Sequence, residues 1–327
     1  MRVYVVNCST SVYNLGCAKL ANYHRRLGCE VVEGPVDWFS HGDLALFSAI
    51  FTKDLEPMVQ QVKLAQHLGM DVRIGGPAVT MLSKWVERET GVKPHIGLIP
   101  EMEKEPGEYK WTFTSRGCPR NCPFCLVTQL EGAQVVEDND FRPAPNIGDN
   151  NILMTTRIHQ ELVVRRSLEA GFSSVDINSG FDCRVFEQDP DDFYHFWNRL
   201  PLAMWRFAFD QAEEEQPIRR TFEYLRRKGL DRHKVQAYVL SNFPGTTPEE
   251  VRYRAEVIKS YGMMPYLMVF RPVNKVKNNY IAEGWDPRTI TRMTGYYNQP
   301  QVWMKCTWEE YNGLALKDQP SLEFSWT

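Results

Sequence analysis

Three cysteines in one short loop are the feature that most restricts what this 327-residue chain can fold into. Cys118, Cys122 and Cys125 directly follow a short apolar strand pattern. Thiolates at spacings of four and three residues can surround one compact inorganic centre, and they leave that centre one ligand short. Because iron–sulfur clusters normally take four such ligands, the loop predicts a cluster with one open iron. An open iron can bind a substrate.

A zinc site, a disulfide and a ferredoxin-type cluster each fit the cysteine loop less well. A structural zinc site usually has four Cys or His ligands in two separated pairs, and no second pair lies nearby in the sequence. A disulfide with a spare thiol is unusual in a chain whose first residues predict a buried strand and not a signal peptide. A ferredoxin-type run has a fourth cysteine soon after, whereas Val127, Thr128 and Gln129 follow here. The iron–sulfur interpretation is favoured, and zinc is the alternative.

The run Ser115-Arg-Gly-Cys-Pro-Arg-Asn-Cys-Pro-Phe-Cys125 resembles the CxxxCxφC signature of the radical S-adenosylmethionine (radical SAM) superfamily, with Phe124 as the aromatic residue φ. The resemblance implies a 4Fe-4S cluster whose open iron chelates the amino and carboxylate groups of S-adenosylmethionine. It also implies an electron donor such as flavodoxin or ferredoxin. The implied reaction is reductive cleavage to a 5′-deoxyadenosyl radical that abstracts hydrogen from a substrate. The cofactor would then carry out the bond cleavage, and the protein would bind and orient it.

Composition places the chain among ordinary globular proteins. Hydrophobic residues make up 43% of the sequence and charged residues 24%. The net charge of −3 gives no support for a constitutive nucleic-acid binder, which usually carries a clear basic excess. No run approaches the roughly 18 apolar residues that a membrane-spanning helix needs. We therefore expect a soluble, cytoplasmic protein that has no membrane partner and whose thiols are reduced.

The first part of the chain alternates strand and helix patterns. Expected strands cover residues 3–6, 30–33, 44–51 and 71–75. The alternation predicts a small Rossmann-like parallel α/β domain over residues 1–105. It resembles the cobalamin-binding-like N-terminal domain of many radical SAM enzymes in its layout and in its Gly75-Gly76-Pro77 turn. Cobalamin is not a favoured cofactor, because the Asp-x-His-x-x-Gly motif of base-off binding is missing.

Three further cysteines, Cys8, Cys17 and Cys29, raise a second hypothesis. Methylthiotransferases carry an auxiliary cluster on three N-terminal cysteines. Here Cys17 falls inside a helical pattern, and a buried cysteine commonly acts as a small apolar residue. Packing is the favoured interpretation, and an auxiliary cluster is the alternative.

Residues 106–275 repeat a strand and helix pattern six times. The expected strands cover residues 111–114, 151–155, 174–177, 204–209, 235–240 and 265–270. Six β/α repeats predict a parallel sheet curved into a partial (β/α)6 TIM-like barrel, with its active site at the carboxyl ends of the strands. The partial barrel of the superfamily has the same number of strands. Thr247-Pro-Glu-Glu250 forms a capping box for the helix after the fifth strand.

Polar residues at these strand ends are further candidates for cofactor binding. Thr155 and Thr156 end the second expected strand, where the superfamily usually carries a Gly-Gly-Glu-like segment that binds the methionine amino group. Asn178 follows the third strand. Arg206, on the fourth strand, can pair with the S-adenosylmethionine carboxylate. A structural salt bridge between Arg206 and an aspartate is the alternative.

The segment after the fifth strand, Leu240-Ser-Asn-Phe-Pro-Gly245, resembles the adenine and ribose segment of the superfamily. The resemblance assigns Asn242 and Gly245 to the cofactor site. An amide side chain offers a donor and an acceptor to a sugar or base. A plain loop that enters a capped helix is the alternative.

Residues 276–327 depart from the repeat and are rich in aromatic side chains. We expect this extension to close the open side of the barrel. Its rings can stack on the bases of a nucleoside or RNA substrate, although core packing is favoured. The sequence thus predicts a radical SAM enzyme with an unidentified substrate and no assigned catalytic residue. Its reaction would be a nucleoside or RNA modification or a methyl transfer, and a non-catalytic iron–sulfur electron-transfer or sensor protein is the alternative.

Overall fold

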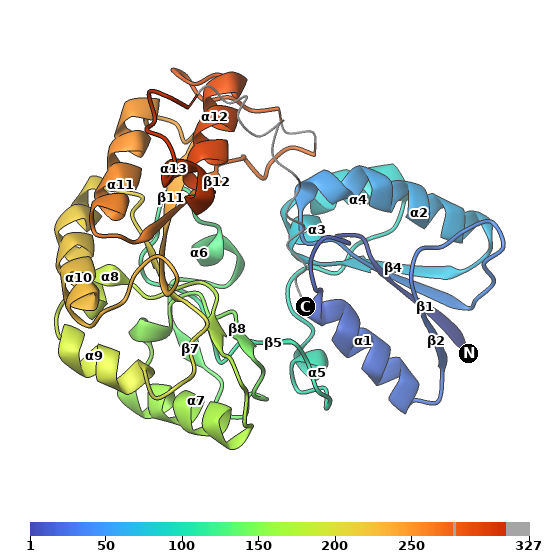
Figure 1. The fold of residues 1–327 in the computed structure, drawn as a ribbon. Helices are drawn as coiled ribbons and strands as arrows, with labels where there is room; N and C mark the ends of the chain where they lie inside the picture. Colours follow the sequence, from blue (N-terminus) through green and yellow to red (C-terminus); the bar gives the residue numbers. More distant parts are fainter. Residues whose placement is uncertain (277–278, 312–327) are drawn as a thin grey trace.

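The computed structural model describes residues 1–276 and 279–311 (Figure 1). The remaining residues, 277–278 and 312–327, lie outside the described part. They include the end of the aromatic-rich extension 276–327, with Trp326. The chain has a mixed α/β fold with parallel sheets. Within the described residues, no helix is long and apolar enough to cross a membrane.

The N-terminal sheet has four parallel strands in the order β2-β1-β3-β4. The strands are β1 (Arg2–Asn7), β2 (Glu30–Glu33), β3 (Leu44–Ser48) and β4 (Asp71–Gly75). Every residue of β3 is buried, as expected for a parallel strand that is covered on both faces. The four strands predicted from the sequence are confirmed, although β3 ends earlier than expected.

Helices cover both faces of this sheet. They are α1 (Leu15–Arg26), α2 (Leu55–His67), α3 (Pro77–Met81), α4 (Ser83–Thr90) and α5 (Pro100–Glu103), with a 3-10 turn η1 (Thr52–Asp54). One face lies against α1, and the other lies against α2, α3 and α4 (Figure 1). Successive side chains of β1 point to opposite faces of the sheet. Val3 and Val5 pack with Cys17 of α1, whereas Tyr4 and Val6 pack on the other face.

The rest of the described chain contains two three-stranded parallel sheets. The first has the order β5-β8-β9, and the second has the order β10-β11-β12. Their strands are β5 (Trp111–Thr112), β8 (Asn146–Ile147), β9 (Asp176–Ile177), β10 (Trp205–Ala208), β11 (Val235–Ser241) and β12 (Met264–Val269). An isolated parallel bridge joins Val175 and Leu202, which precede β9 and β10. These are two sheets rather than one six-stranded sheet, so the barrel stays a prediction.

One predicted strand is wrong. The sequence placed the second strand at residues 151–155, but β8 lies earlier in the chain, where it pairs with both β5 and β9. Ile152 and Leu153 are buried from a 3-10 turn, η2 (Ile152–Met154). A short apolar run indicates burial without showing whether a strand or a helical turn achieves it.

Helices alternate with these strands and bury one side of them. They are α6 (Val127–Leu130), α7 (Arg157–Glu169), α8 (Cys183–Phe186), α9 (Pro190–Trp197), α10 (Glu215–Arg227), α11 (Pro248–Ser260), α12 (Pro287–Tyr297) and α13 (Pro300–Trp303), with a 3-10 turn η3 (Ala212–Glu214). The largest core cluster includes Phe207, Ala237 and Leu267 from the second sheet. The capping box at Thr247 is confirmed, with Glu250 as its partner.

Candidate functional site

The cysteine loop connects β6 (Ser115–Arg116) to β7 (Val136–Glu137), a short antiparallel pair. Gly117 leaves β6 with a φ of 83°, and a Cβ added there would lie 2.0 Å from the carbonyl oxygen of Gln134. Only glycine fits such a close approach in this conformation. The amide of Cys118 then donates to the carbonyl oxygen of Gly132 at 3.2 Å, which closes the base of the loop.

The three thiols of this loop are half-buried. Burial raises the pKa of Cys122, and nearby Cys125 and Cys118 add to the effect of burial, while Arg184 opposes it. The thiols therefore share one electrostatic environment, and the donor set suits an iron–sulfur cluster. Among the described residues, however, no group of three or more Cys, His, Asp or Glu side chains is gathered around a common metal position. The three thiols of the loop are therefore not arranged as a closed cage, and their role as cluster ligands stays a prediction.

A buried carboxylate ties this loop to the start of α8. The Asp182 side chain is 3% exposed. Arg120 Nε donates to Asp182 Oδ2 at 2.6 Å, and Arg184 Nε donates to Asp182 Oδ1 at 3.0 Å. Burial acts to raise the pKa of Asp182, but Arg184, Arg120 and Asn151 outweigh it and hold this pKa below its ordinary value. Asp182 is therefore an ionised anchor for the middle of the cysteine loop.

Asn151 joins this anchor to the first cysteine. Its Nδ2 donates to Asp182 Oδ2 at 3.0 Å and lies 3.9 Å from Cys118 Sγ. The sequence motifs do not assign Asn151, Asp182 or Arg120 to the site. Two signals were present, because Arg120 lies between two motif cysteines and Asp182 ends the loop after the third strand. Asn151 carries no signal of its own in the sequence, because the apolar run that follows it predicts a strand beginning at residue 151.

Aromatic side chains bring the ends of β11 and β12 to the same loop. The ring of Phe124 packs edge-to-face on Phe243, with centroids 5.8 Å apart. Phe243 packs in turn on Phe270, at 4.9 Å. Together with Asn151 and Asp182, these contacts place residues that follow β8, β9, β11 and β12 around the cysteine loop. This is the edge of a β/α fold where active sites lie.

Asn242 holds the loop after β11 in place. Its side chain is buried and its φ is 59°. Nδ2 donates to the carbonyl oxygens of Phe270 and Tyr280, each at 3.1 Å, and Oδ1 accepts from the amide of Ala282 at 2.9 Å. Both amide hydrogens are thus used on the backbone. Gly245 has a φ of 81° and open space where a Cβ would lie, so its backbone conformation accounts for the glycine.

Arg206 forms the structural ion pair that the sequence left as an alternative. Its Nε and Nη2 donate to the two carboxylate oxygens of Asp176, at 2.9 and 2.7 Å, and Nη1 donates to Gln236. The pair joins β9 to β10. Asn178 directly follows β9, and its carbonyl oxygen accepts from the Tyr238 hydroxyl at 3.4 Å.

Thr155 and Thr156 have local roles. Thr155 Oγ1 donates to the carbonyl oxygen of Ile152 at 2.7 Å, within the turn η2. Thr156 is the N-cap of α7, where its hydroxyl accepts from the amide of His159 at 3.2 Å. These contacts explain the two threonines as turn and cap residues.

Two more acidic residues extend the network beyond Arg184. Glu214 Oε1 lies 3.4 Å from Arg184 Nη1, and Glu214 Oε2 accepts from the amide of Asp210 at 2.7 Å. Asp210 Oδ1 accepts from the amide of Leu240 at 2.6 Å. Burial raises the pKa of Asp210 to about 7, and the charge of Glu214 adds to that effect. A chain of polar groups thus runs from the cysteine loop to the ends of β10 and β11.

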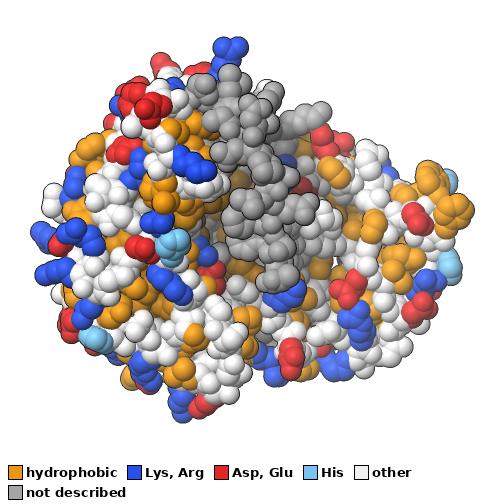
Figure 2. Space-filling model, viewed as in Figure 1, with side chains coloured by type: hydrophobic (Ala, Val, Ile, Leu, Met, Phe, Trp, Pro, Cys, Tyr) orange, Lys and Arg blue, Asp and Glu red, His pale blue; other side chains and the backbone are white. Residues whose placement is uncertain are grey.

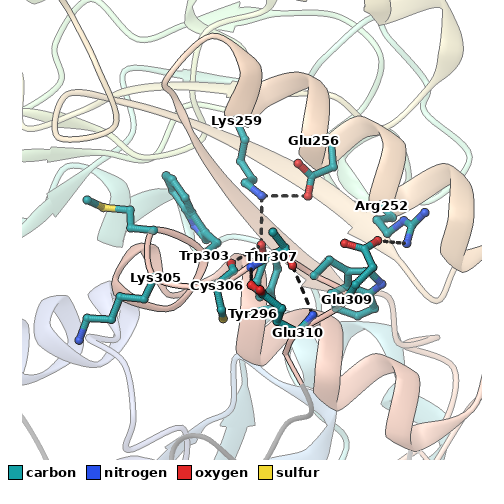
Figure 3. Close-up of a pocket in the computed structure, with 12 residues that line it drawn as sticks. Arg252, Glu256, Lys259, Tyr296, Trp303, Lys305, Cys306, Thr307, Glu309 and Glu310 are labelled. Atoms are coloured by element: carbon teal, nitrogen blue, oxygen red, sulfur yellow. Dashed lines mark hydrogen bonds and ion pairs between the residues drawn. The ribbon is translucent and has the colours of Figure 1, made fainter.

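A pocket of about 500 Å³ lies elsewhere, between α11, α12 and the segment 303–310 (Figure 3). Lys259 Nζ lies 4.9 Å from the ring centroid of Tyr296 and 5.5 Å from that of Trp303, and it pairs with Glu256 at 2.9 Å. The protein's own lysine therefore covers this aromatic surface. Tyr296 and Tyr297 are buried, as the core-packing interpretation of the aromatic extension expects.

Comparisons with known proteins bear on the fold. No protein-family model matches the sequence, and no curated protein matches it. The chain does share its fold with a radical SAM methyltransferase. That protein is TsrM from Kitasatospora setae, whose structure holds a tryptophan substrate and the S-adenosylmethionine analogue aza-SAM. The TM-score is 0.55 at 12% identity, and the match covers 83% of this chain and 73% of that one.

Proposed function

We propose that this chain is a radical SAM enzyme, in which Cys118, Cys122 and Cys125 hold a 4Fe-4S cluster beside a site for S-adenosylmethionine. One observation carries the proposal. Residues that follow β8, β9, β11 and β12 meet around a three-cysteine loop, in a fold shared with a radical SAM methyltransferase. When bound, the cluster and S-adenosylmethionine supply the electron and the radical precursor, and a flavodoxin or ferredoxin is the proposed donor.

The chain's own residues position and enclose this site. Arg120 and Asp182 fix the middle of the cysteine loop to α8. The rings of Phe124 and Phe243 pack edge-to-face against each other at the cysteine loop. Direct contacts from Thr155, Thr156, Asn178, Arg206, Asn242 and Gly245 to S-adenosylmethionine stay predictions. The partners of Arg206 and Asn242 favour structural roles for those two.

We further propose that the two three-stranded sheets act as one partial (β/α)6 barrel. The parallel bridge between Val175 and Leu202 supports this, because it lies between the sheets. A parallel sheet of this kind presents its carboxyl edge to the site.

The N-terminal sheet does not favour a corrinoid. Polar side chains at its carboxyl edge bond to one another, with Ser9 Oγ donating to Asp54 at 2.5 Å and Asn14 Nδ2 to Ser48 Oγ at 3.0 Å. Packing within the protein explains Gly76 without a ligand, because a Cβ added at this residue would lie 2.8 Å from Ser48 Oγ. We propose that this part of the chain binds no cobalamin. Corrinoid absorbance retained after incubation with hydroxocobalamin and gel filtration would contradict this.

The substrate class is also a proposal. An extended RNA contact needs a basic surface, whereas Figure 2 shows positive and negative side chains interspersed on the viewed face. The net charge of −3 agrees. These observations favour a small substrate, such as a nucleoside or a methyl acceptor, over a long RNA.

Anaerobic reconstitution tests the proposed function. Wild-type protein given dithionite and S-adenosylmethionine should form 5′-deoxyadenosine and methionine, and Cys122→Ala should form neither. A matched control, Cys17→Ala, removes a cysteine that is buried in α1 and should cleave like wild type. If the chain is instead an electron-transfer or sensor protein, the cluster should form without cleavage of S-adenosylmethionine. Absence of 5′-deoxyadenosine from the wild-type reaction would therefore contradict the proposal.

A further inference from the structure

The sheet β10-β11-β12 has one face covered by helices and one open face. Phe207, Ala237 and Leu267 pack in the largest core cluster with side chains of α10 and α11. Because successive side chains of a strand point to opposite faces, the neighbours of these residues point away from the two helices. None of those neighbours belongs to a hydrophobic core cluster of the described residues. The open face includes Arg206, Gln236, Tyr238, Met264, Tyr266 and Met268.

A row of hydrogen-bonded side chains crosses the open face near the amino ends of the strands. Arg206 donates to both carboxylate oxygens of Asp176 and to Gln236. Gln236 Nε2 in turn lies 3.7 Å from Met264 Sδ, so the row runs from β9 to β12. The side chains of Asp176 and Arg206 are each 17% exposed, and they neutralise each other through two hydrogen bonds. The row therefore offers a bound molecule hydrogen bonds but no uncompensated charge.

Two tyrosine rings lie beside this row, on the side of the carboxyl ends of the strands. Tyr238 and Tyr266 are in register, and their rings pack edge-to-face with centroids 6.0 Å apart. Tyr238 Oη donates to the carbonyl oxygen of Asn178, whereas no described residue hydrogen-bonds to the hydroxyl of Tyr266. Both tyrosines are half-buried, and Met268, two residues further along β12, is 48% exposed. Aromatic and thioether surface is therefore accessible at this level of the sheet.

The open face leads to the cysteine loop. β11 and β12 are followed by Phe243 and Phe270, whose rings pack against each other, and Phe243 packs on Phe124 of the cysteine loop. A molecule bound to the two tyrosines would thus lie on the side of the hydrogen-bonded row that faces this loop. That is the side of a parallel sheet where active sites lie.

The side chains of the open face select one class of small molecule. Tyrosine rings favour a flat aromatic partner, which they can meet edge-to-face or in offset stacks. A methionine sulfur also makes favourable contacts with aromatic rings. A charged partner would lose its hydration without meeting a free counter-ion, because Asp176 and Arg206 are already paired. The hydroxyl of Tyr266 can still donate or accept one hydrogen bond.

We propose that the open face binds the substrate, and that the substrate presents an uncharged, planar aromatic ring to Tyr238, Tyr266 and Met268. The inference rests on the proposed function, which locates the reactive centre at the cysteine loop. It makes Tyr266 a specificity-determining residue, because its ring and its hydroxyl both face the bound ring. Binding is non-covalent, and no chemical step is assigned to the tyrosines.

Three matched probes test this inference. Benzamide is planar and uncharged, benzoate is its charged counterpart, and cyclohexanecarboxamide is its saturated counterpart. Dissociation constants are measured by ligand-observed NMR on cluster-loaded protein saturated with S-adenosylmethionine, which occupies its own aromatic site. Wild type should bind benzamide about threefold or more tightly than cyclohexanecarboxamide, as expected for an aromatic contact. It should bind benzamide about tenfold more tightly than benzoate.

Two variants on the open face should change these preferences in different ways. Tyr266→Leu should weaken benzamide binding about threefold or more and remove the preference over cyclohexanecarboxamide. Met268→Lys places a cation beside the proposed ring position, so it should bind benzoate more tightly than wild type does. General loosening of the fold would not improve the binding of any probe. Iron content and the circular dichroism spectrum verify that each variant is loaded and folded.

The matched control is Tyr253→Leu. Tyr253 is 51% exposed on α11, which covers the opposite face of the sheet, and its hydroxyl donates to Glu215. This variant should keep both wild-type preferences. An equal loss in Tyr253→Leu and Tyr266→Leu would overturn the inference.

The remaining outcomes are also decisive. If wild type takes up the cluster and S-adenosylmethionine but shows no preference for benzamide, or does not bind it, the inference fails and the proposed function stands. An unchanged preference in Tyr266→Leu has the same meaning. If no cluster forms or S-adenosylmethionine does not bind, the proposed function fails and the inference fails with it. Should Tyr266→Leu not fold, Met268→Lys decides in its place, and unchanged benzoate binding in that variant would overturn the inference.

Discussion

Gly117 is the residue at which the cysteine loop has least freedom. Gly117→Ala would place a methyl group within 2.0 Å of a carbonyl oxygen in a left-handed backbone conformation. We expect a loss of about 3 kcal/mol in the free energy of unfolding and weaker iron loading, because the backbone has to move. Gly132→Ala is the control, since its φ of 93° is also positive but its Cβ would meet nothing within 4 Å. It should lose about 1–2 kcal/mol. Equal losses would contradict the account.

The raised pKa of Asp210 predicts that the free energy of unfolding depends on pH. Its pKa rises from 3.8 to about 7 in the folded protein, so the folded state favours the neutral acid. The stability from this shift is fully present below about pH 4 and is lost as the pH rises through about 7. Asp210→Asn keeps the acceptor for the Leu240 amide without ionising. Urea unfolding should show the variant gaining about 3 kcal/mol on wild type between pH 4 and 7. Parallel pH profiles would contradict this.

At the scale of single residues, sequence and structure agree best where the motif is contiguous. Phe124 and the three cysteines share one loop, so their proximity follows from spacing. Arg206 was placed correctly on its strand, but its partner, Asp176, lies on another strand. A sequence pattern locates a residue at a strand end without naming the atoms that it meets. The partners of Asn151 come from two distant segments, and no local pattern could indicate them.

At the scale of elements, the long strands were predictable, whereas one of the two-residue strands, β8, was misplaced. β11 and β12 are runs of seven and six residues whose burial alternates or persists along the strand. β5, β8 and β9 have two residues each. Such short strands are defined by pairing with their neighbours rather than by propensity, because β-propensity depends strongly on context. This is why the second strand was placed too late in the chain.

The link between the cysteine loop and α8 gives a prediction at this scale. Asp182→Ala removes the buried partner of Arg120, one of the two buried partners of Arg184 and the N-cap of α8, so we expect a loss of about 3 kcal/mol in stability. A double-mutant cycle with Arg120→Ala should give a coupling energy of about 1 kcal/mol or more. The control cycle uses the exposed pair Arg199 and Glu161, which should couple by less than about 1 kcal/mol. No coupling between Arg120 and Asp182 would count against the proposed anchor.

At the scale of the whole molecule, Glu103 connects the N-terminal part of the chain to β6, the strand that precedes the cysteine loop. Glu103 of α5 accepts from Lys19 of α1 and from Arg116 of β6, at 3.4 and 3.3 Å. The expected boundaries after residues 105 and 275 stay predictions. Burial raises the pKa of Cys8 and of Cys17 to about 12, so both thiols behave as packed neutral groups. A single cluster stays a prediction.

Metal analysis of reconstituted protein tests the central claim most directly. Wild type should hold about four irons per chain, as one 4Fe-4S cluster requires. Cys122→Ala should lose them, and Cys17→Ala should keep them. Zinc in place of iron, or full iron retention in Cys122→Ala, would contradict the assignment of Cys118, Cys122 and Cys125. About eight irons in wild type, with about half lost in Cys17→Ala, would show an auxiliary cluster and contradict the single-cluster account.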